Sequence, residues 1–281
     1  MRTDEDRALI ARVLGKRIER VSVLVDYGYR AAWRVEAGGS TFAVKVDTRA
    51  GFQEREYLAL LRAQAAGVPV PEVVKFENEP VPTLVLRWLA GVPLEELADP
   101  LPALHKAGEL MRTVHDFSAV EGEWWGDRIR EWLARDLAYC VERRRLEPEI
   151  AERLRQVAES RMAAIAGYGS SWLHGDFQPA HILIDPESSQ VMAIIDWGDA
   201  GPGDAAYDLT VLSMDHPRYV TPFLDGYGAD AAFRERFALV LPIYRMARAA
   251  GSARWLDDHG YVGVEWPLAV IRDAWREVGG G

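Results

Sequence analysis

Cysteine is almost absent from this chain, which has one, Cys140, in 281 residues. A single cysteine forms no internal disulfide and cannot build a cysteine-based metal site. It lies in "DLAYCVERRR", where we expect a helix with a buried thiol. The sequence therefore predicts a protein of a reducing compartment.

Basic residues are also in deficit. Lysine and arginine number 33 against 43 aspartates and glutamates, so the formal net charge is −10. Nucleic-acid backbones select basic surfaces, and we therefore expect no nucleic-acid partner. An acidic surface is compatible with a cationic small-molecule partner, although acidic composition also serves solubility alone.

Long apolar runs are missing as well. "FALVLPIY", residues 237–244, is among the longest, and it is far shorter than a helix that spans a bilayer. The first ten residues, "MRTDEDRALI", are charged and do not have the pattern of a signal peptide. We therefore expect no membrane partner and a cytoplasmic location.

The first third of the chain has the pattern of a small sheet. Residues 4–14 predict a short helix, and residues 18–46 predict strands rich in valine and aromatic residues. Residues 52–67 have helical spacing and end at a glycine. "TLVLRWLAG", residues 83–91, predicts a further strand that runs into a turn.

Helices dominate the rest of the chain. Amphipathic segments predict helices over residues 101–117, 126–145 and 147–167, and again from Ala205 onward. Only "HILID" and "VMAIID", on either side of a "PESSQ" turn, have the pattern of strands. The sequence thus predicts a β-rich first third joined to a helical remainder.

Four short passages carry charged residues at the ends of these elements: "FAVK" (42–45), "QERE" (53–56), "HGDFQPAH" (174–181) and "IIDWG" (194–198). Each alone has an ordinary structural interpretation, such as a solvated strand end or a turn. In this order they match the groups that kinase-type phosphoryl transfer needs. Those groups are a lysine on a strand, an acid on the next helix, an aspartate near the attacking hydroxyl, and two further ligands for magnesium.

The chain resembles the aminoglycoside phosphotransferase and choline-kinase-like family from about Val21 to Leu212. The passages that carry the resemblance are "WLHGDFQPAHILID", "AIIDWGDAGPGDAAYDL" and "GVPVPEVV". It implies an α+β, protein-kinase-like fold with two lobes: a small β-rich N-terminal lobe with one helix, and a larger, mainly helical C-terminal lobe. We expect a nucleotide-binding lobe over residues 1–88 and a catalytic and substrate-binding lobe over residues 89–281.

The resemblance also implies roles for single residues. Asp176 takes the position of the catalytic base, which accepts or orients the proton of the substrate hydroxyl. Asp196 matches the principal magnesium ligand, and Lys45 matches the lysine that binds phosphate. Glu56 fits the acidic partner of that lysine, and Glu54 is the alternative.

Further positions follow from the same resemblance. The backbone of Arg87 and Leu89 is expected to contact the nucleotide base, and Gly28 lies in the turn expected to cover the phosphates. His174 is expected to brace the catalytic loop, and Asp208 to pin it.

His181 departs from the family pattern, which most often has asparagine at this position. A carboxamide oxygen suits Mg²⁺ better than an imidazole nitrogen does, and imidazole ligation fades when the ring is protonated. Three roles stay open for His181: a Mg²⁺ ligand, a phosphate contact, or a support for the loop.

The acceptor pocket is expected in the helical lobe. Asp257, Asp258 and Trp255 combine acids with an aromatic face, which suits a cationic or sugar-like ligand. Each of them is also compatible with a solvated loop that is anchored in the core. Asp199, just past the magnesium strand, is a further candidate.

These observations predict a Mg²⁺-dependent small-molecule kinase that uses ATP or GTP as co-substrate. The acceptor is expected to be a hydroxyl of an antibiotic of the aminoglycoside, macrolide or peptide type, so that the activity gives resistance. Two alternatives remain: a metabolic kinase of a sugar, amino alcohol or homoserine-like substrate, and a nucleotide-binding pseudokinase. A monomer and a homodimer are both compatible with the sequence.

Overall fold

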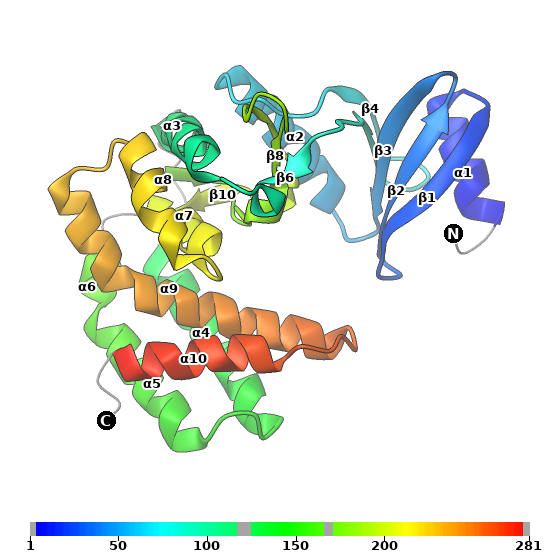
Figure 1. Ribbon diagram of the computed structural model, residues 1–281. Helices are drawn as coiled ribbons and strands as arrows, with labels where there is room; N and C mark the ends of the chain where they lie inside the picture. Colours follow the sequence, from blue (N-terminus) through cyan, green and yellow to red (C-terminus); the bar gives the residue numbers. More distant parts are fainter. Residues whose placement is uncertain (1–3, 117–124, 166–170, 278–281) are drawn as a thin grey trace. The chain divides into compact units, whose positions relative to one another are not determined.

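The computed structural model describes residues 4–116, 125–165 and 171–277 (Figure 1). The chain divides into two compact units. Unit 1 combines Met1–Ala103 with the returning segment Pro179–Ala200, and unit 2 holds Leu104–Gln178 and Gly201–Gly281. The predicted division into functional lobes over residues 1–88 and 89–281 stays a prediction.

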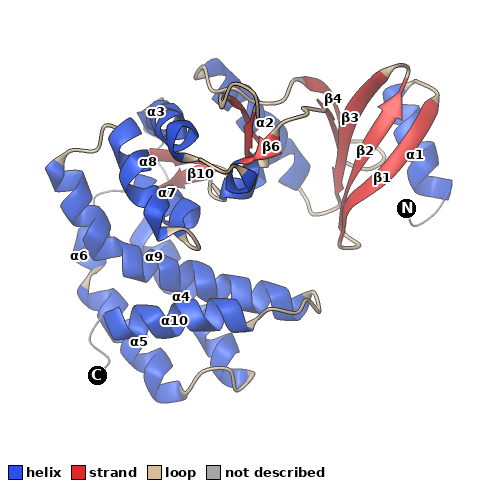
Figure 2. Ribbon diagram, viewed as in Figure 1, coloured by secondary structure: helices blue, strands red, loops and turns tan. Residues whose placement is uncertain are grey.

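Unit 1 is built on a five-stranded antiparallel sheet in the order β1-β2-β3-β5-β4 (Figure 2). The strands are β1 Ile18–Asp26, β2 Arg30–Ala37, β3 Ser40–Asp47, β4 Val73–Glu77 and β5 Thr83–Arg87. Valine recurs in the first three, with Trp33 in β2 and Phe42 in β3, and such side chains pack well on a pleated surface.

Two helices belong to unit 1. In α1, Asp4–Leu14, Ile10 and Val13 are buried in a core that includes Trp33 and Phe42 of the sheet. In α2, Phe52–Ala65, the buried residues recur at helical spacing and include Glu56. The two helices that the sequence predicts over residues 4–14 and 52–67 are thus both present, and the first packs on the sheet as part of its core.

The returning segment adds a small antiparallel sheet to unit 1, in the order β6-β8-β9. Its strands are β6 Val92–Pro93, β8 Ile182–Ile184 and β9 Val191–Ile194, and the short 3₁₀ turns are η1 Leu94–Glu96, η2 Pro179–His181 and η3 Trp197–Asp199. The "PESSQ" turn between β8 and β9 is confirmed: the amide of Asp185 donates to the carbonyl of Gln190 at 2.9 Å.

Unit 2 is mostly helical (Figure 2). Its helices are α3 Leu101–Asp116, of which the first three residues fall in unit 1, α4 Trp125–Glu142, α5 Pro148–Ser160, α6 Met162–Ile165, α7 Ala205–Ser213, α8 Val220–Gly226, α9 Ala231–Asp258 and α10 Glu265–Glu277, with η4 Pro217–Tyr219 before α8. The long helix α9 packs against α4, α7 and α10. A two-stranded antiparallel pair, β7 Ser171–Leu173 with β10 Gly201–Gly203, completes the unit.

Two details differ from the expectations. The helix expected over residues 147–167 is interrupted at Arg161, which separates α5 from α6. The short strands β6, β7 and β10 were not predicted: "VP", "SWL" and "GPG" have no alternating β-branched residues such as Ile182 and Ile184, which mark β8. Cys140 is buried in α4 as expected, and burial raises the pKa of its thiol to about 11. In the described part of the chain, no helix has the length and apolar character to cross a membrane.

Candidate active site

A cluster of charged side chains lies in unit 1. Lys45, near the end of β3, donates its Nζ to Oε1 of Glu56 on α2 and, at 2.8 Å, to Oδ1 of Asp196. The amide of Gln53 donates to the second oxygen of Glu56 at 3.1 Å. Of the two acids that the sequence offered, the structure brings Glu56 to the lysine, while Glu54 is exposed.

The backbone around Asp196 is held on both sides. The amide of Ile195 donates to the carbonyl of His181 at 2.9 Å, and the indole of Trp197 donates to the carbonyl of Ile194 at 2.9 Å. Asp196 itself has a φ of 63°, in the left-handed region that few residues other than glycine adopt. Its side chain is thus fixed at the end of β9 and directed toward Lys45.

Gly198 allows this loop to approach α2. A Cβ atom at this position would lie 2.8 Å from Cε1 and 2.9 Å from Cζ of Phe52. No side chain fits at that distance without displacement of the ring, which is itself buried. The glycine of "IIDWG" is therefore required for contact between η3 and α2.

Arg30 is a second cation at Asp196, and the sequence analysis missed it. It begins β2, and its Nη2 donates to Oδ1 of Asp196 at 2.9 Å and to Oδ2 at 3.1 Å. His181 is also near, with Nε2 3.8 Å from Oδ2 of Asp196. Two acids and two permanent cations therefore share one small volume.

These contacts shift the ionisation of the cluster. Burial by itself raises the pKa of the Asp196 carboxyl, but the charges of Lys45 and Arg30 outweigh it and hold the pKa below its ordinary value. Burial lowers the pKa of the Lys45 amine, and Asp196 and Glu56 more than compensate, so that the pKa is raised. Burial keeps the pKa of Glu56 above its ordinary value despite Lys45. At neutral pH, Lys45 is charged and Asp196 is ionised.

The side chains of Asp196 and His181 fit a magnesium ion whose other ligands are phosphate oxygens of a nucleotide. Within the described ranges, no three His, Cys, Asp or Glu side chains form a cage for a metal ion. Mg²⁺ in phosphoryl-transfer sites is held by one or two carboxylates together with substrate phosphates. Asp196 supplies such a carboxylate, and His181 is the weaker donor for a hard cation.

The "HGD" loop of unit 2 is organised by a buried carboxylate. Asp208 of α7 accepts hydrogen bonds from the amides of His174 at 2.8 Å and Gly175 at 2.9 Å. The amide of Asp176 donates to Nδ1 of His174 at 3.2 Å. These bonds satisfy three consecutive amides and fix the backbone that carries Asp176.

The carboxylate of Asp176 is bonded by the side chains of Gln178 and Arg248. Gln178 donates its Nε2 to Oδ1 at 2.7 Å, and Arg248 of α9 donates its Nη2 to the same oxygen. Asp176 is only 15% exposed and Arg248 27%. Arg248 was not predicted, since it lies 72 residues further along the chain and in no motif.

A second buried network lies below this loop. The imidazole of His115 lies between Asp208, at 3.1 Å from Nε2, and the hydroxyl of Tyr227, at 2.9 Å from Nδ1. Asp204 caps α7 through the amide of Ala206 and forms a two-bond ion pair with Arg236. Buried hydrogen bonds of unit 2 therefore hold Asp208, which in turn holds the loop that carries Asp176.

The residues predicted to contact the nucleotide lie in unit 1. Arg87 ends β5, pairs with Phe42 of β3 in the register, and bonds Glu72 through its side chain at 3.2 Å. Leu89 follows in the extended segment after β5. Gly28 lies in the β1–β2 turn with a φ of 92°, and its amide donates to Asp26 at 3.1 Å. Their contacts to a nucleotide remain a prediction.

The residues predicted to bind the acceptor belong to both units: Asp199 to unit 1, and Trp255, Asp257 and Asp258 of α9 to unit 2. Asp257 forms an ion pair with Arg145, with the shorter N–O distance 2.6 Å, and Asp258 accepts a hydrogen bond from Tyr139 at 3.0 Å. Asp258 is thus engaged by Tyr139 of α4, and Asp257 by Arg145 in the turn that follows α4.

Trp255 stacks on Tyr261 with ring centroids 5.4 Å apart, and the two rings are 39% and 46% exposed. Asp199 is exposed at the end of η3 in unit 1. An acceptor role for Trp255, Asp199, Asp257 and Asp258 stays a prediction.

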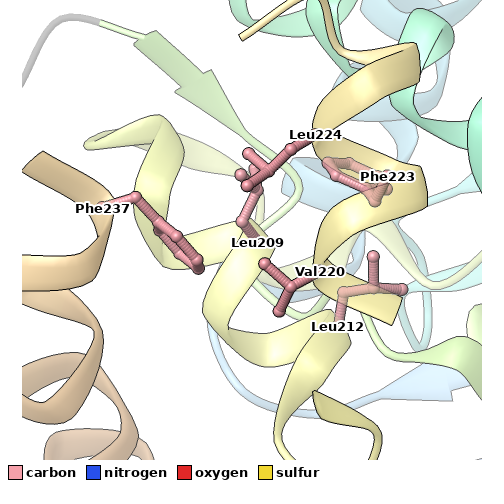
Figure 3. A pocket seen from close by; sticks show the side chains of 6 residues that line it. All are labelled: Leu209, Leu212, Val220, Phe223, Leu224 and Phe237. Carbon is pink, nitrogen blue, oxygen red and sulfur yellow. The ribbon is translucent and has the colours of Figure 1, made fainter. Parts of the chain in front are cut away.

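Unit 2 also contains an apolar hollow among α7, α8 and α9 (Figure 3). It is lined by Leu209, Leu212, Val220, Phe223, Leu224 and Phe237. These side chains offer no group that binds a phosphate or orients a hydroxyl. We therefore assign the hollow to core packing.

Known proteins with similar sequences include curated relatives. Two curated relatives are an aminoglycoside 3'-phosphotransferase of Streptomyces fradiae and a streptomycin 3''-kinase of Streptomyces griseus. The first is 26% identical over 61% of this chain and 71% of the relative, and the second is 28% identical over 73% and 83%.

Solved structures confirm the fold class. The GDP complex of aminoglycoside 2'-phosphotransferase-IIIa superposes with a TM-score of 0.73 at 18% identity, covering 99% of both chains. A thermostable mutant of aminoglycoside phosphotransferase APH(4)-Ia, in a ternary complex with ADP and hygromycin B, has a TM-score of 0.68 at 19% identity and covers 99% of this chain and 100% of that one. The fold of this chain is therefore that of the protein-kinase-like phosphotransferases.

The family itself is shown at the level of sequence. Residues 25–239 match the profile of the phosphotransferase enzyme family, APH, and this range contains Lys45, Glu56, Asp176 and Asp196. With most of its length inside that match, this chain belongs to the phosphotransferase enzyme family.

Proposed function

We propose that this chain transfers the γ-phosphoryl group of ATP or GTP to a hydroxyl of a small molecule, and that the acceptor is an antibiotic of the aminoglycoside, macrolide or peptide type. The observation that carries the proposal is the cluster of Lys45, Glu56 and Asp196, in which a protonated amine and an ionised carboxylate are held together by buried contacts. Catalysis of phosphoryl transfer consists largely of such positioning and charge stabilisation.

The residues of unit 1 have complementary tasks in this proposal. Lys45 binds phosphate oxygens as a fixed positive charge, and Glu56 keeps the amine directed away from bulk solvent. Asp196, with His181 beside it, would hold a magnesium ion. When bound, such an ion neutralises the charge on the phosphate oxygens.

Asp176 of unit 2 takes or orients the proton of the acceptor hydroxyl. A positioned carboxylate must come within about 2.6–3.2 Å of the proton donor. Gln178 and Arg248 hold one oxygen of Asp176, which limits the rotation of the carboxylate. Gly175 and His174 keep the loop backbone in place through Asp208.

The named relatives support an antibiotic as the acceptor, since both curated relatives act on aminoglycosides according to their names. A metabolic kinase is the second candidate. It is favoured by the pairing of Asp257 with Arg145 and of Asp258 with Tyr139, which leaves these acids poorly suited to bind a polycation. Solved structures of a choline/ethanolamine kinase family protein from Mesorhizobium loti and of a putative fructosamine-3-kinase from Thermobifida fusca also share the fold, with TM-scores of 0.72 and 0.71.

A panel of acceptors tests the proposal. The chain would be incubated with ATP or GTP, Mg²⁺, and hydroxylated antibiotics beside sugars, amino alcohols and homoserine. The products would be read by mass spectrometry, with Asp176→Ala run in parallel. An antibiotic that gains one phosphoryl group only with the wild type supports the proposal. A phosphorylated metabolite alone favours the second candidate, and nucleotide binding without any product favours a pseudokinase.

The cellular setting is part of the same proposal. We expect the protein to act in the reducing cytoplasm as a monomer or homodimer, without a nucleic-acid or membrane partner. The acidic composition and the single buried thiol support this expectation.

A further inference from the structure

Arg30 is an unassigned cation at the centre of the charged cluster. Its guanidinium reaches both oxygens of Asp196, at 2.9 and 3.1 Å. The side chain is 23% exposed, so it is neither fully buried nor an ordinary surface arginine. A salt bridge to the predicted magnesium ligand is unlike the surface pairs found elsewhere in the chain.

The register of the sheet explains why Arg30 reaches this position. Ala32 of β2 pairs with Lys45 of β3, and Arg30 pairs with Asp47. Directly paired residues share a face, and residues two apart on a strand share it as well. Arg30 and Lys45 therefore emerge on the same face of neighbouring strands and converge on one carboxylate.

The backbone at Arg30 is fixed by the turn that precedes it. The amide of Tyr27 donates to the carbonyl of Arg30 at 2.8 Å, and the amide of Thr48 donates to the carbonyl of Tyr29 at 2.8 Å. The side chain is thus anchored at the base of the β1–β2 turn, which is the turn expected to cover the phosphates. Because the backbone of Arg30 is fixed and its side chain is long and flexible, the guanidinium can exchange partners over a few ångströms.

The charge balance indicates which group Arg30 would bind when it leaves Asp196. Arg30 and Lys45 together balance the negative charges of Glu56 and Asp196. A divalent cation on Asp196 would bind the oxygens that now accept from Arg30 and would repel the guanidinium. Phosphate oxygens bring compensating negative charge, and the planar fork of arginine suits them.

Arginines gather near Arg30 although the whole chain is acidic, and one of them, Arg49, is paired with the buried Asp47 at 2.6 Å. The ring of Phe52 has Arg49 at 3.9 Å, Arg55 at 5.3 Å and Arg30 at 5.7 Å from its centroid. Such a concentration of guanidinium groups favours a polyanion at this end of unit 1.

We propose that Arg30 is a phosphate-binding residue of the nucleotide site: it is paired with Asp196 in this structure and moves to the phosphate oxygens when a divalent cation binds Asp196. This proposal rests on the proposed function. It has two consequences. Arg30 competes with a cation that arrives alone, and it strengthens the binding of a cation together with a nucleotide.

The two consequences are tested with Arg30→Met, which removes the charge and keeps most of the length of the side chain. Arg20→Met is the matched control, because Arg20 is an exposed arginine of β1 in the same sheet. Calorimetry would measure the affinity for AMP-PNP in excess Mg²⁺, and electron paramagnetic resonance would measure the affinity for Mn²⁺ alone. Circular dichroism would check that each variant is folded.

We expect Arg30→Met to weaken the binding of Mg²⁺ with AMP-PNP about tenfold, as for the loss of a charge-assisted hydrogen bond. The same variant is expected to bind Mn²⁺ alone more tightly than the wild type does. Arg20→Met is expected to change neither affinity. Arg30→Lys keeps the charge without the fork and is expected to give intermediate values, which keeps the test valid if the methionine variant does not fold.

Several results would overturn the proposal. One is an unchanged nucleotide affinity in Arg30→Met, and another is an equal loss in Arg20→Met. Weaker binding of Mn²⁺ alone in Arg30→Met would show that Arg30 supports the cation site instead of competing for it. Failure of the proposed function is distinguishable, because it is read from product formation by the wild type, whereas the role of Arg30 is read from the affinities for AMP-PNP and Mn²⁺. A wild type that binds no nucleotide would overturn both proposals.

Discussion

At Asp196, the backbone and the side chain are both held in arrangements that cost free energy. The backbone lies in the left-handed region at a φ of 63°, and the carboxylate is largely buried between two cations. Backbone strain of this kind persists only where the surrounding structure determines it, and it is concentrated at functional sites. The bonds of Ile195 and Trp197 to neighbouring backbone supply that determination.

Asp196→Asn is expected to reduce the free energy of unfolding by about 1–3 kcal/mol at pH 7. This loss is smaller than the roughly 3–5 kcal/mol typical when one partner of a fully buried ion pair is removed, because the side chain of Asp196 keeps 26% exposure. The folded-state pKa of Asp196 lies below its unfolded value of about 3.9, so its stabilisation is present above that pH and lost as the pH falls. Denaturant unfolding at pH 7, 5, 4 and 3 should therefore show the difference between wild type and variant shrinking below about pH 4. A difference that stays constant down to pH 3 would contradict this account.

His181→Asn tests the role of the imidazole. If the ring stands in for the carboxamide usual in the family, the variant should keep its activity and need about two- to tenfold less Mg²⁺ for half-maximal nucleotide binding, because a hard cation prefers oxygen. The Mg²⁺ dependence of calorimetric nucleotide binding measures this, with His181→Ala as the control that offers no ligand. Collapse of activity in a folded Asn variant would mean that the imidazole has a task that asparagine cannot perform.

Among the elements, the contact between α2 and η3 positions both acids of the cluster. α2 carries Glu56 and Phe52, and η3 follows directly after Asp196. Gly198 brings the two elements together, since its missing side chain leaves room for the ring of Phe52. The geometry of the charged cluster therefore depends on a packing contact that contains no charge.

Gly198→Ala is expected to lower the free energy of unfolding by about 1–3 kcal/mol through overpacking and to weaken nucleotide binding as Asp196 moves. Gly201→Ala is the control, because nothing lies within 4 Å of a Cβ atom there. Phe52→Leu should restore part of the loss when combined with Gly198→Ala, which a double-mutant cycle measures. Additive effects of the two substitutions would show that the ring is not the obstacle.

The sequence predicted those elements whose pattern is local. β1 to β3 follow from runs of valine and aromatic residues, and Lys45, Glu56, Asp176 and Asp196 lie in short passages with a recognisable order. Strands of two or three residues, such as β6 and β10, are stabilised by their partners and have no pattern of their own.

Other features of the candidate site depend on tertiary contacts. Arg30 becomes relevant only once the register of β2 and β3 is known, and Arg248 only once α9 is placed beside the "HGD" loop. Asp257 was selected from composition, and only the structure reveals its ion pair with Arg145.

At the scale of the whole molecule, each compact unit contains a different part of the proposed chemistry. Unit 1 holds the cations and the carboxylate expected at the phosphates, and unit 2 holds the carboxylate expected at the acceptor hydroxyl. The net charge of −10 is unevenly placed, since Arg30, Arg49 and Arg55 gather around one ring of unit 1. Substitutions in unit 1 should thus act on nucleotide affinity, and substitution of Asp176 should act on transfer.

The rate of γ-phosphoryl transfer in Asp176→Asn, with the nucleotide dissociation constant determined on the same sample, tests the central claim most directly. Asparagine keeps the shape of the side chain but cannot accept the hydroxyl proton. We predict a rate at least about 100-fold below that of the wild type, which is the smallest effect usual for a general base, with a nucleotide affinity within about twofold. Transfer at the wild-type rate by Asp176→Asn would contradict the assignment of the base. Absence of transfer from the wild type to any acceptor, despite nucleotide binding, would contradict the proposed activity itself.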